Sequence, residues 1–184
     1  MLPELLIRAL IFKAGDYSLA LFYRSDSLVF AFYDVDPDYA KYLKQFDPKV
    51  PDIKYKTNDK FVCGVVLDVC GVQYYAPISH VTQKNRTSFL IMDGASPISS
   101  IRFSFMFPAP VSVLSLKMIG TIAKYDQPYA DLLAKELRYC SVHLEEIYAK
   151  AEKVYKIGCN KAHALNPLCC DFKLLEEASK KYCL

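Results

Sequence analysis

A lysine, a serine and a histidine flank a β-hairpin that the sequence predicts. Lys60 comes just before an apolar stretch at residues 61–69, and Ser79 and His80 follow a second stretch at residues 72–77. A tight turn at Gly71 would make the two strands antiparallel, so the start of the first and the end of the second lie at the same end of the sheet. We therefore expect an ammonium, an alcohol and an imidazole to be neighbours in space.

These three groups meet the needs of phosphodiester cleavage in RNA. Imidazoles titrate close to neutral pH, so His80 could take or give a proton. Lys60 could hold the phosphate and stabilise its additional negative charge. Ser79 could orient the 2′-hydroxyl or a phosphate oxygen. Because the 2′-hydroxyl of the substrate would be the nucleophile, this chemistry requires no metal or cofactor, and DNA would resist cutting.

Each of these residues also has an ordinary structural interpretation. A histidine in a polar loop is most often a surface residue, and a lysine at the end of a strand is usually solvated. A serine such as Ser79, which follows Pro77 and Ile78, could simply cap a turn. The residue types alone therefore leave the catalytic and the structural interpretations open.

Two polar loops next to the hairpin carry most of the nearby positive charge. The first loop covers residues 47–59 and the second covers residues 79–87. Both should lie at the same end of the sheet, where their cations could form a groove for RNA. The candidates are Lys54, Lys56, Lys84, Asn85 and Arg86. Later cations could widen the groove: Lys117, Lys124, Lys173, Lys180 and Lys181. Surface lysines are common, however, and most bind nothing.

The composition is that of one folded domain. The chain has 184 residues, of which 53% are hydrophobic and 23% charged, with a net charge of +3 that permits but does not require a polyanionic partner. Seven cysteines in a chain of this length indicate reduced thiols in a cytosolic protein. No run of 18 apolar residues exists, so we expect no membrane span.

Four residues near residue 165 invite a comparison with zinc sites. Cys159, His163, Cys169 and Cys170 have a spacing that matches no common pair of zinc-binding knuckles, and adjacent cysteines chelate one ion awkwardly. We therefore expect buried or surface thiols and no metal.

The first 28 residues allow two interpretations. They are rather apolar at the start but lack the cleavage site of a signal peptide. They could form an additional amphipathic element, or they could be upstream sequence from a start codon that is set too early.

The periodicity along the chain predicts an α+β fold. Stretches rich in β-branched and aromatic residues predict about six strands: residues 29–35, 61–69, 72–77, 88–92, 101–107 and 111–116. Helical spacing predicts a short helix after Pro37 with Asp36 as its N-cap, a long helix over residues 128–156, and a shorter one over residues 172–182 with Asp171 as its N-cap. Short antiparallel strands avoid bare edges by curling, so we expect a small, partly closed barrel.

Several segments match a known toxin family in their order and spacing. They are residues 32–33 (FY), 39–43 (YAKYL), 46–51 (FDPKVP), 60–67 (KFVCGVVL), 75–79 (YAPIS), 101–108 (IRFSFMFP), the long helix from Pro128, and residues 170–177 (CDFKLLEE). The sequence thus resembles the ToxN/AbiQ toxins of type III toxin–antitoxin systems. The resemblance covers nearly everything from residue 29 onward, so we predict a single endoribonuclease toxin domain at residues 29–184, with residues 1–28 outside it.

The resemblance implies a bacterial, cytoplasmic endoribonuclease with an SH3-like barrel of the MazF and Kid type. Toxins of this family cut mRNA in preferred contexts without a metal, leave a 2′,3′-cyclic phosphate, and arrest growth as a defence against phage. Their antitoxin is a short, repeated pseudoknot RNA and not a protein. The toxin cuts this RNA from its precursor and stays bound to it in a hetero-oligomer.

The resemblance also implies roles for individual residues. A tyrosine and a lysine before the first hairpin strand of the family match Tyr55 and Lys60, and a Thr-Ser pair after the second strand matches Ser79 and His80. Lys84 is the nearest candidate for a further lysine. The chain departs from the family in one additional residue between Tyr55 and Lys60, and in carrying His80 where serine is expected.

Two other functions stay open at this point. A non-catalytic RNA-binding barrel would use the same basic end only to grip RNA. A gyrase-inhibiting or DNA-binding relative could share the barrel, but only the analogy between folds favours it.

Overall fold

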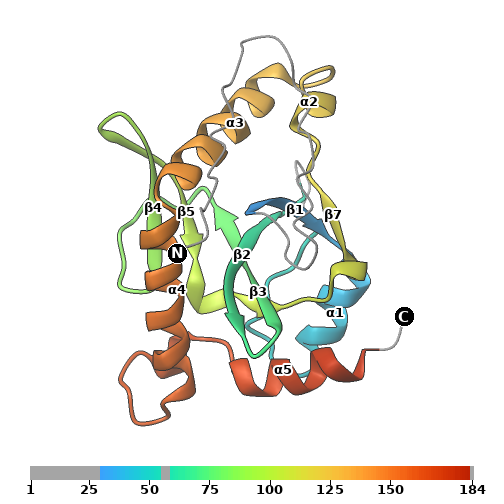
Figure 1. Ribbon diagram of the computed structural model, residues 1–184, viewed down its shortest axis with the longest axis vertical. Helices are drawn as coiled ribbons and strands as arrows, with labels where there is room; N and C mark the ends of the chain where they lie inside the picture. Colours follow the sequence, from blue (N-terminus) through green and yellow to red (C-terminus); the bar gives the residue numbers. More distant parts are fainter. Residues whose placement is uncertain (1–29, 55–58, 183–184) are drawn as a thin grey trace, which may run out of the picture.

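An antiparallel sheet forms the centre of the protein, and helices cover it in an α+β arrangement (Figure 1). The computed structural model describes residues 30–54 and 59–182, without the side chain of Val65. The predicted extension at residues 1–28 therefore lies outside the described residues, as do Tyr55 and Lys56.

The sheet has seven strands. In spatial order, six of them are β4 (Ser88–Asp93), β5 (Ser96–Arg102), β3 (Val72–Ser79), β2 (Val62–Val69), β1 (Ala31–Val35) and β7 (Leu114–Leu116). The short strand β6 (Phe107–Pro108) pairs with β3. The edge strands β4 and β7 do not pair with each other, so the sheet stays open where we expected a partly closed barrel. The edges are protected in another way, because β7 is very short and β4 packs against a helix.

The predicted hairpin is confirmed as β2 and β3. Cys70 and Gly71 at its turn both have positive φ, 52° and 83°, as a tight two-residue turn between twisted strands requires. The side chain of Asp68 accepts a hydrogen bond of 2.8 Å from the Gly71 N–H. Val62 pairs with Pro77, and Cys63 pairs with Ala76.

The strand predicted at residues 101–107 is wrong in its position. The strand β5 covers Ser96–Arg102, and the chain then turns through a short 3-10 segment, η1 (Phe103–Phe105), before β6. Serines are weak strand formers, so residues 96–100 carry little strand signal of their own. Pairing with β3 and β4 on both sides makes them a strand. The predicted strand at residues 111–116 is also divided, into η2 (Val111–Val113) and β7.

The two predicted N-caps are confirmed. The helix α1 (Pro37–Lys44) begins with Asp36, whose carboxylate accepts a hydrogen bond of 2.9 Å from the Asp38 N–H. The helix α5 (Phe172–Lys181) begins with Asp171, which accepts a hydrogen bond of 3.1 Å from the Leu174 N–H. Capping side chains satisfy backbone donors that have no partner in the first turn.

The long helix predicted at residues 128–156 is two helices. They are α3 (Gln127–Val142) and α4 (Leu144–Cys159), and the short helix α2 (Ile119–Ile122) precedes them. In an unbroken helix, the N–H of His143 would bond the carbonyl of Tyr139. Here the imidazole Nδ1 of His143 forms a hydrogen bond of 2.8 Å with the Tyr139 carbonyl. The backbone N–H of His143 instead donates to the Cys140 carbonyl at 3.0 Å. The side chain thus replaces a backbone bond, and the helix breaks at this residue.

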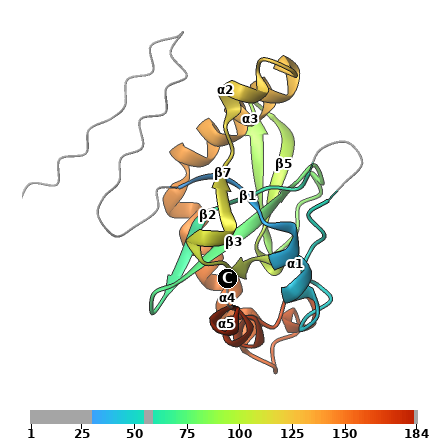
Figure 2. The same ribbon diagram turned by 90° about the vertical axis from the view of Figure 1, so that its right-hand side faces the viewer.

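The helices lie on opposite sides of the sheet (Figure 2). The helices α3 and α4 cover one face, where the ring of Phe89 on β4 lies 6.2 Å from the ring of Tyr139. The helix α1 lies on the other side, and α5 closes the lower end together with η3 (Asn166–Leu168). None of the described helices has the length and apolar character that crossing a lipid bilayer demands.

Candidate active site

Lys60 lies opposite Ser79 at one end of the sheet. The pairing of β2 with β3 continues beyond Val62, because the Ile78 N–H donates to the Phe61 carbonyl at 3.3 Å. The same register therefore sets Lys60 against Ser79, on one face of the sheet. Residues in this relation have Cβ atoms about 4.5–5.5 Å apart. Both residues are half-buried, and the Lys60 N–H is held by the Ile53 carbonyl at 2.8 Å.

Ser100 on β5 completes this row of polar residues, although the sequence analysis did not identify it. It pairs with Ser79 from the other side of β3. Its hydroxyl donates a hydrogen bond of 2.6 Å to the Val81 carbonyl, while the Val81 N–H donates to the Ser79 hydroxyl at 3.3 Å. The two serines thus anchor the beginning of the loop that follows β3.

His80 follows Ser79 directly, at a bend where β3 ends. Its side chain is exposed to solvent. The chain therefore offers an imidazole within one residue of the half-buried hydroxyl of Ser79.

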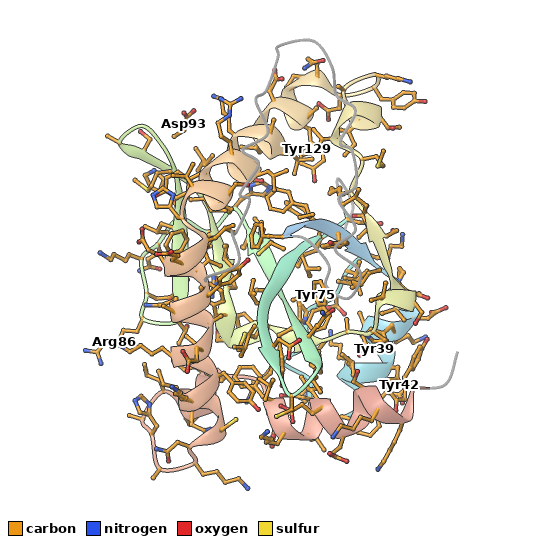
Figure 3. All side chains as sticks on the ribbon, in the orientation of Figure 1. Tyr39, Tyr42, Tyr75, Arg86, Asp93 and Tyr129 are labelled. Carbon is orange, nitrogen blue, oxygen red and sulfur yellow. The ribbon has the colours of Figure 1, made fainter. Side chains whose placement is uncertain are left out.

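The remaining residues of the second polar loop lie towards α4. Burial lowers the pKa of the Lys150 ammonium on α4, and the like charges of Lys153 and Lys84 lower it further. Lys84 is therefore a neighbour of α4. The side chain of Asn85 accepts a hydrogen bond of 2.9 Å from the Thr87 N–H and shapes the end of the loop. Arg86 points outward beside α4 (Figure 3).

Ion pairs occupy several of the cations that were predicted to line a groove. Lys54 pairs with Asp59 at 2.7 Å, and Lys117 pairs with Asp34 at 2.7 Å. Lys117 is also nearly buried, with 9% of its surface exposed, so it cannot widen a groove. Two further pairs join neighbouring residues of α5: Lys173 with Glu176, and Lys180 with Glu177.

A cavity of about 440 Å³ lies beside this end of the sheet. It is lined by the ends of β1 and β7 and by residues of the loop before Lys60, among them Asp34, Asp36, Ile53, Asp59 and Ser115. Lys60 and Ser79 are not part of its lining. The cavity is therefore adjacent to the Lys60–Ser79 pair, because Asp59 lines it and directly precedes Lys60 in the chain.

A buried carboxyl group lies directly behind the row of serines. Glu136 on α3 is 1% exposed, and neither of its carboxyl oxygens has a hydrogen-bond partner among the described residues. Burial raises its pKa from 4.5 to about 7. The hydroxyl of Ser99, next to Ser100 on β5, opposes this rise only in part, since no hydrogen bond of normal geometry joins the two groups.

The structure also describes most of the cysteines and possible metal ligands. The six described cysteines are free thiols. Cys169 and Cys170 are buried, Cys159 is exposed, and Nδ1 of His163 accepts a hydrogen bond from the Leu165 N–H at 3.1 Å. In the described part of the chain, no three histidine, cysteine or acidic side chains are grouped so that they could hold a metal ion.

Comparison with known proteins places these observations in a family. A family model described as the toxin ToxN of type III toxin–antitoxin systems matches residues 31–180. The endoribonuclease ToxN of Pectobacterium atrosepticum is 27% identical over 163 residues, which cover 82% of this chain and 92% of that protein. The endoribonuclease AbiQ of Lactococcus lactis subsp. lactis is 26% identical over 166 residues, or 82% of this chain and 88% of that protein.

Solved structures agree with this result. One, which concerns selective inhibition of a type III toxin by a non-coding RNA pseudoknot, has a TM-score of 0.76 and 26% identity, and the match covers 82% of this chain and 96% of the other. The structure of AbiQ, a lactococcal anti-phage endoribonuclease of a type III system, has a TM-score of 0.73 and 27% identity, with 83% and 97% covered. The similarity therefore extends over nearly the whole of each related chain.

Proposed function

We propose that this chain, which belongs to the ToxN toxin family of type III toxin–antitoxin systems, is an endoribonuclease that cleaves mRNA and the precursor of its own RNA antitoxin. The related ToxN and AbiQ proteins are endoribonucleases. By analogy with the toxin that a non-coding RNA pseudoknot inhibits, the inhibitor of this chain is a pseudoknot RNA, bound to it in a hetero-oligomer. Growth arrest in the bacterial cytoplasm then serves as defence against phage.

The observation that supports the proposal is the hydrogen bond from the Ile78 N–H to the Phe61 carbonyl, which extends the hairpin register beyond Val62 and Pro77 and so sets Lys60 opposite Ser79. A cation and a hydroxyl on one sheet face, with His80 next in the chain, supply a phosphate ligand, an orienting group and a proton carrier. Attack of a 2′-hydroxyl on the neighbouring phosphodiester requires these three groups.

The reaction needs only the substrate's own 2′-hydroxyl as nucleophile. His80 takes the 2′-hydroxyl proton while the 2′-oxygen forms a bond to phosphorus. The bond from phosphorus to the 5′-oxygen breaks, and that oxygen receives a proton as it leaves. Lys60 stabilises the negative charge on the non-bridging oxygens, and Ser79 orients the reacting group. The products are a 2′,3′-cyclic phosphate and a 5′-hydroxyl, and no metal takes part.

The other predicted residues keep supporting roles in this proposal. Tyr55 contacts the phosphate or stacks on a base, and Lys84 holds the RNA backbone. The surrounding polar residues steer RNA into the site: Lys54, Lys56, Asn85 and Arg86. We also propose that residues 29–184 act as one toxin domain, and that its open sheet is a variant of the SH3-like barrel of MazF and Kid. Superposition of β1 to β5 on such a barrel tests the last point.

Purified protein and an end-labelled, A-rich RNA test the activity. We expect cleavage in the presence of EDTA and a product mass that corresponds to a 2′,3′-cyclic phosphate. Lys60→Ala should lower kcat by a factor of about 10² to 10³, as removal of a charge-stabilising donor does elsewhere. Ser79→Ala and His80→Ala should each lower kcat by a factor of about 10² or more while the affinity for RNA is kept.

Ser141→Ala is the matched control, because Ser141 is an exposed serine on α3, on the other face of the sheet. A single 2′-deoxy nucleotide at the cleaved linkage should abolish cutting by the unmodified protein. RNA that stays intact while it binds firmly would favour the rival function, a non-catalytic RNA-binding protein. Cleavage that EDTA abolishes would contradict the mechanism.

A further inference from the structure

Arg102 and Ser88 form a cross-strand pair in which two buried hydrogen-bonding atoms, one on each side chain, have no partner among the described residues. Ser88 begins β4 and pairs directly with Arg102 at the end of β5. Ser88 is 7% exposed, and its hydroxyl has no partner within residues 30–54 and 59–182. The Nε–H of Arg102 is buried and also lacks a partner in the part of the chain that the structure describes. Among the ion pairs of residues 30–54 and 59–182, none includes Arg102.

Such a pair of donors is costly unless a ligand satisfies it. Buried polar groups in folded proteins almost always have partners, and a half-buried cation without a counter-ion loses hydration without compensation. The guanidinium carbon of Arg102 lies 5.4 Å from the centre of the Phe105 ring. Arg102 as a whole is only half-buried, so part of its guanidinium stays within reach of an anion.

The pair faces the same side of the sheet as the Lys60–Ser79 pair. Alternate residues of a strand point to the same face, so Arg102 and Ser100 share a face, and Ser100 pairs with Ser79. Phe89, between Ser88 and the rest of β4, packs instead against Tyr139 of α3. Arg102 is therefore a diagonal neighbour of Ser79, at a distance of about 7–8 Å between backbone positions.

We propose that Arg102 and Ser88 bind a phosphate of the RNA backbone that is not cleaved, next to the linkage held by Lys60 and Ser79. The guanidinium fork matches two oxygens of one phosphate, and the serine hydroxyl donates a further hydrogen bond. This site fixes the register of the RNA strand across β4, β5, β3 and β2. The proposal rests on the proposed function and adds a second anchoring point to it.

Replacing single phosphates of the RNA by uncharged methylphosphonates tests this phosphate site. A set of short RNAs is prepared in which one phosphate at a time is a methylphosphonate, and every RNA carries a 2′-deoxy nucleotide at the cleavage point so that it stays intact. Affinities are measured by fluorescence anisotropy. For the unmodified protein, we expect one position beside the cleavage point at which the substitution weakens binding about tenfold. Arg102→Ala should bind the unmodified RNA about tenfold more weakly and be insensitive to substitution at that same position.

Three variants separate this result from a general loss of charge or of folding. Arg138→Ala removes an exposed arginine on α3 and should keep the full sensitivity. Arg102→Lys keeps the positive charge but loses the forked arrangement of N–H donors. Its sensitivity to the methylphosphonate should lie between those of Arg138→Ala and Arg102→Ala. If Arg102→Ala fails to fold, Ser88→Ala takes its place, because it changes little volume. It should weaken binding at the same phosphate position.

The outcomes distinguish this site from the proposed function. If Arg102→Ala stays sensitive at every position, or cuts RNA with an unchanged KM, the phosphate site is refuted while the nuclease stands. If the protein never cuts RNA, the same methylphosphonate series is made without the 2′-deoxy nucleotide; coupling between Arg102 and one phosphate of that series would keep the phosphate site while the nuclease falls.

Discussion

Replacing the buried Glu136 by glutamine should stabilise the protein above neutral pH. Its carboxyl group has no hydrogen-bond partner among the described residues, and burial raises its pKa to about 7, compared with 4.5 in solution. The folded state therefore keeps a proton that the unfolded chain releases between these two pH values. At about 1.4 kcal/mol per pH unit, the free energy of unfolding falls by about 3 kcal/mol across this window.

The sign of the effect follows from the raised pKa. Below pH 4.5 the group is protonated in both states and the protein bears no penalty from it, whereas above pH 7 the full penalty is present. Glu136→Gln removes the ionisation. The difference in stability between the variant and the unmodified protein should therefore increase steadily from pH 5 to pH 7 and stay constant from pH 8 upward.

Urea denaturation at each pH, under reducing conditions, measures this difference. Glu145→Gln is the control, since Glu145 is an exposed glutamate in the first turn of α4. Its substitution should change the free energy of unfolding by less than about 0.5 kcal/mol at every pH. A difference for Glu136→Gln that is the same at pH 5 and pH 8 would refute the argument, because it would mean that Glu136 is ionised to the same extent in the folded and the unfolded state over this range.

Three further substitutions test contacts that hold the fold. Glu176→Ala removes the acceptor of the Tyr74 hydroxyl at 2.8 Å and should cost about 3 kcal/mol in urea denaturation, whereas Glu177→Ala, at an exposed neighbour, should cost less than about 0.5 kcal/mol. Gly64→Ala would place a Cβ atom against the Tyr75 ring and should cost about 1–3 kcal/mol, a loss that Tyr75→Leu in the same chain should reduce. Asp171→Ala removes the cap of α5 and should lower the melting temperature by the equivalent of about 1 kcal/mol.

Local signals in the sequence were sufficient for the elements whose boundaries depend on local chemistry. The aspartates before α1 and α5 cap them as predicted, and the Gly71 turn forms the expected hairpin. The turn predicts only that Lys60 and Ser79 lie at the same end of the hairpin. The exact partner depends on the register shift between Cys63 and Leu67, because the register continued unshifted from Val69 and Val72 would set Lys60 against Val81.

Features that depend on tertiary partners were not predictable in this way. The serine-rich strand β5 has little strand propensity and forms because β3 and β4 pair with it. The break between α3 and α4 depends on the imidazole of His143, which takes the carbonyl of Tyr139, and helical periodicity carries no sign of it. Arg102 escaped notice as a candidate site residue for the same reason, because its neighbours are set by β5.

The contacts of α5 have a consequence for the order in which parts of the protein can fold during synthesis. Its residues accept hydrogen bonds from tyrosines far earlier in the chain: Tyr42 reaches the Ala178 carbonyl at 3.0 Å, and Tyr74 reaches Glu176. While residues 172–181 are still inside the ribosome, these hydroxyls have no such partners, and the hairpin that carries Lys60 and Ser79 lacks its support. The last helix to be synthesised therefore completes the packing around the hairpin that carries Lys60 and Ser79.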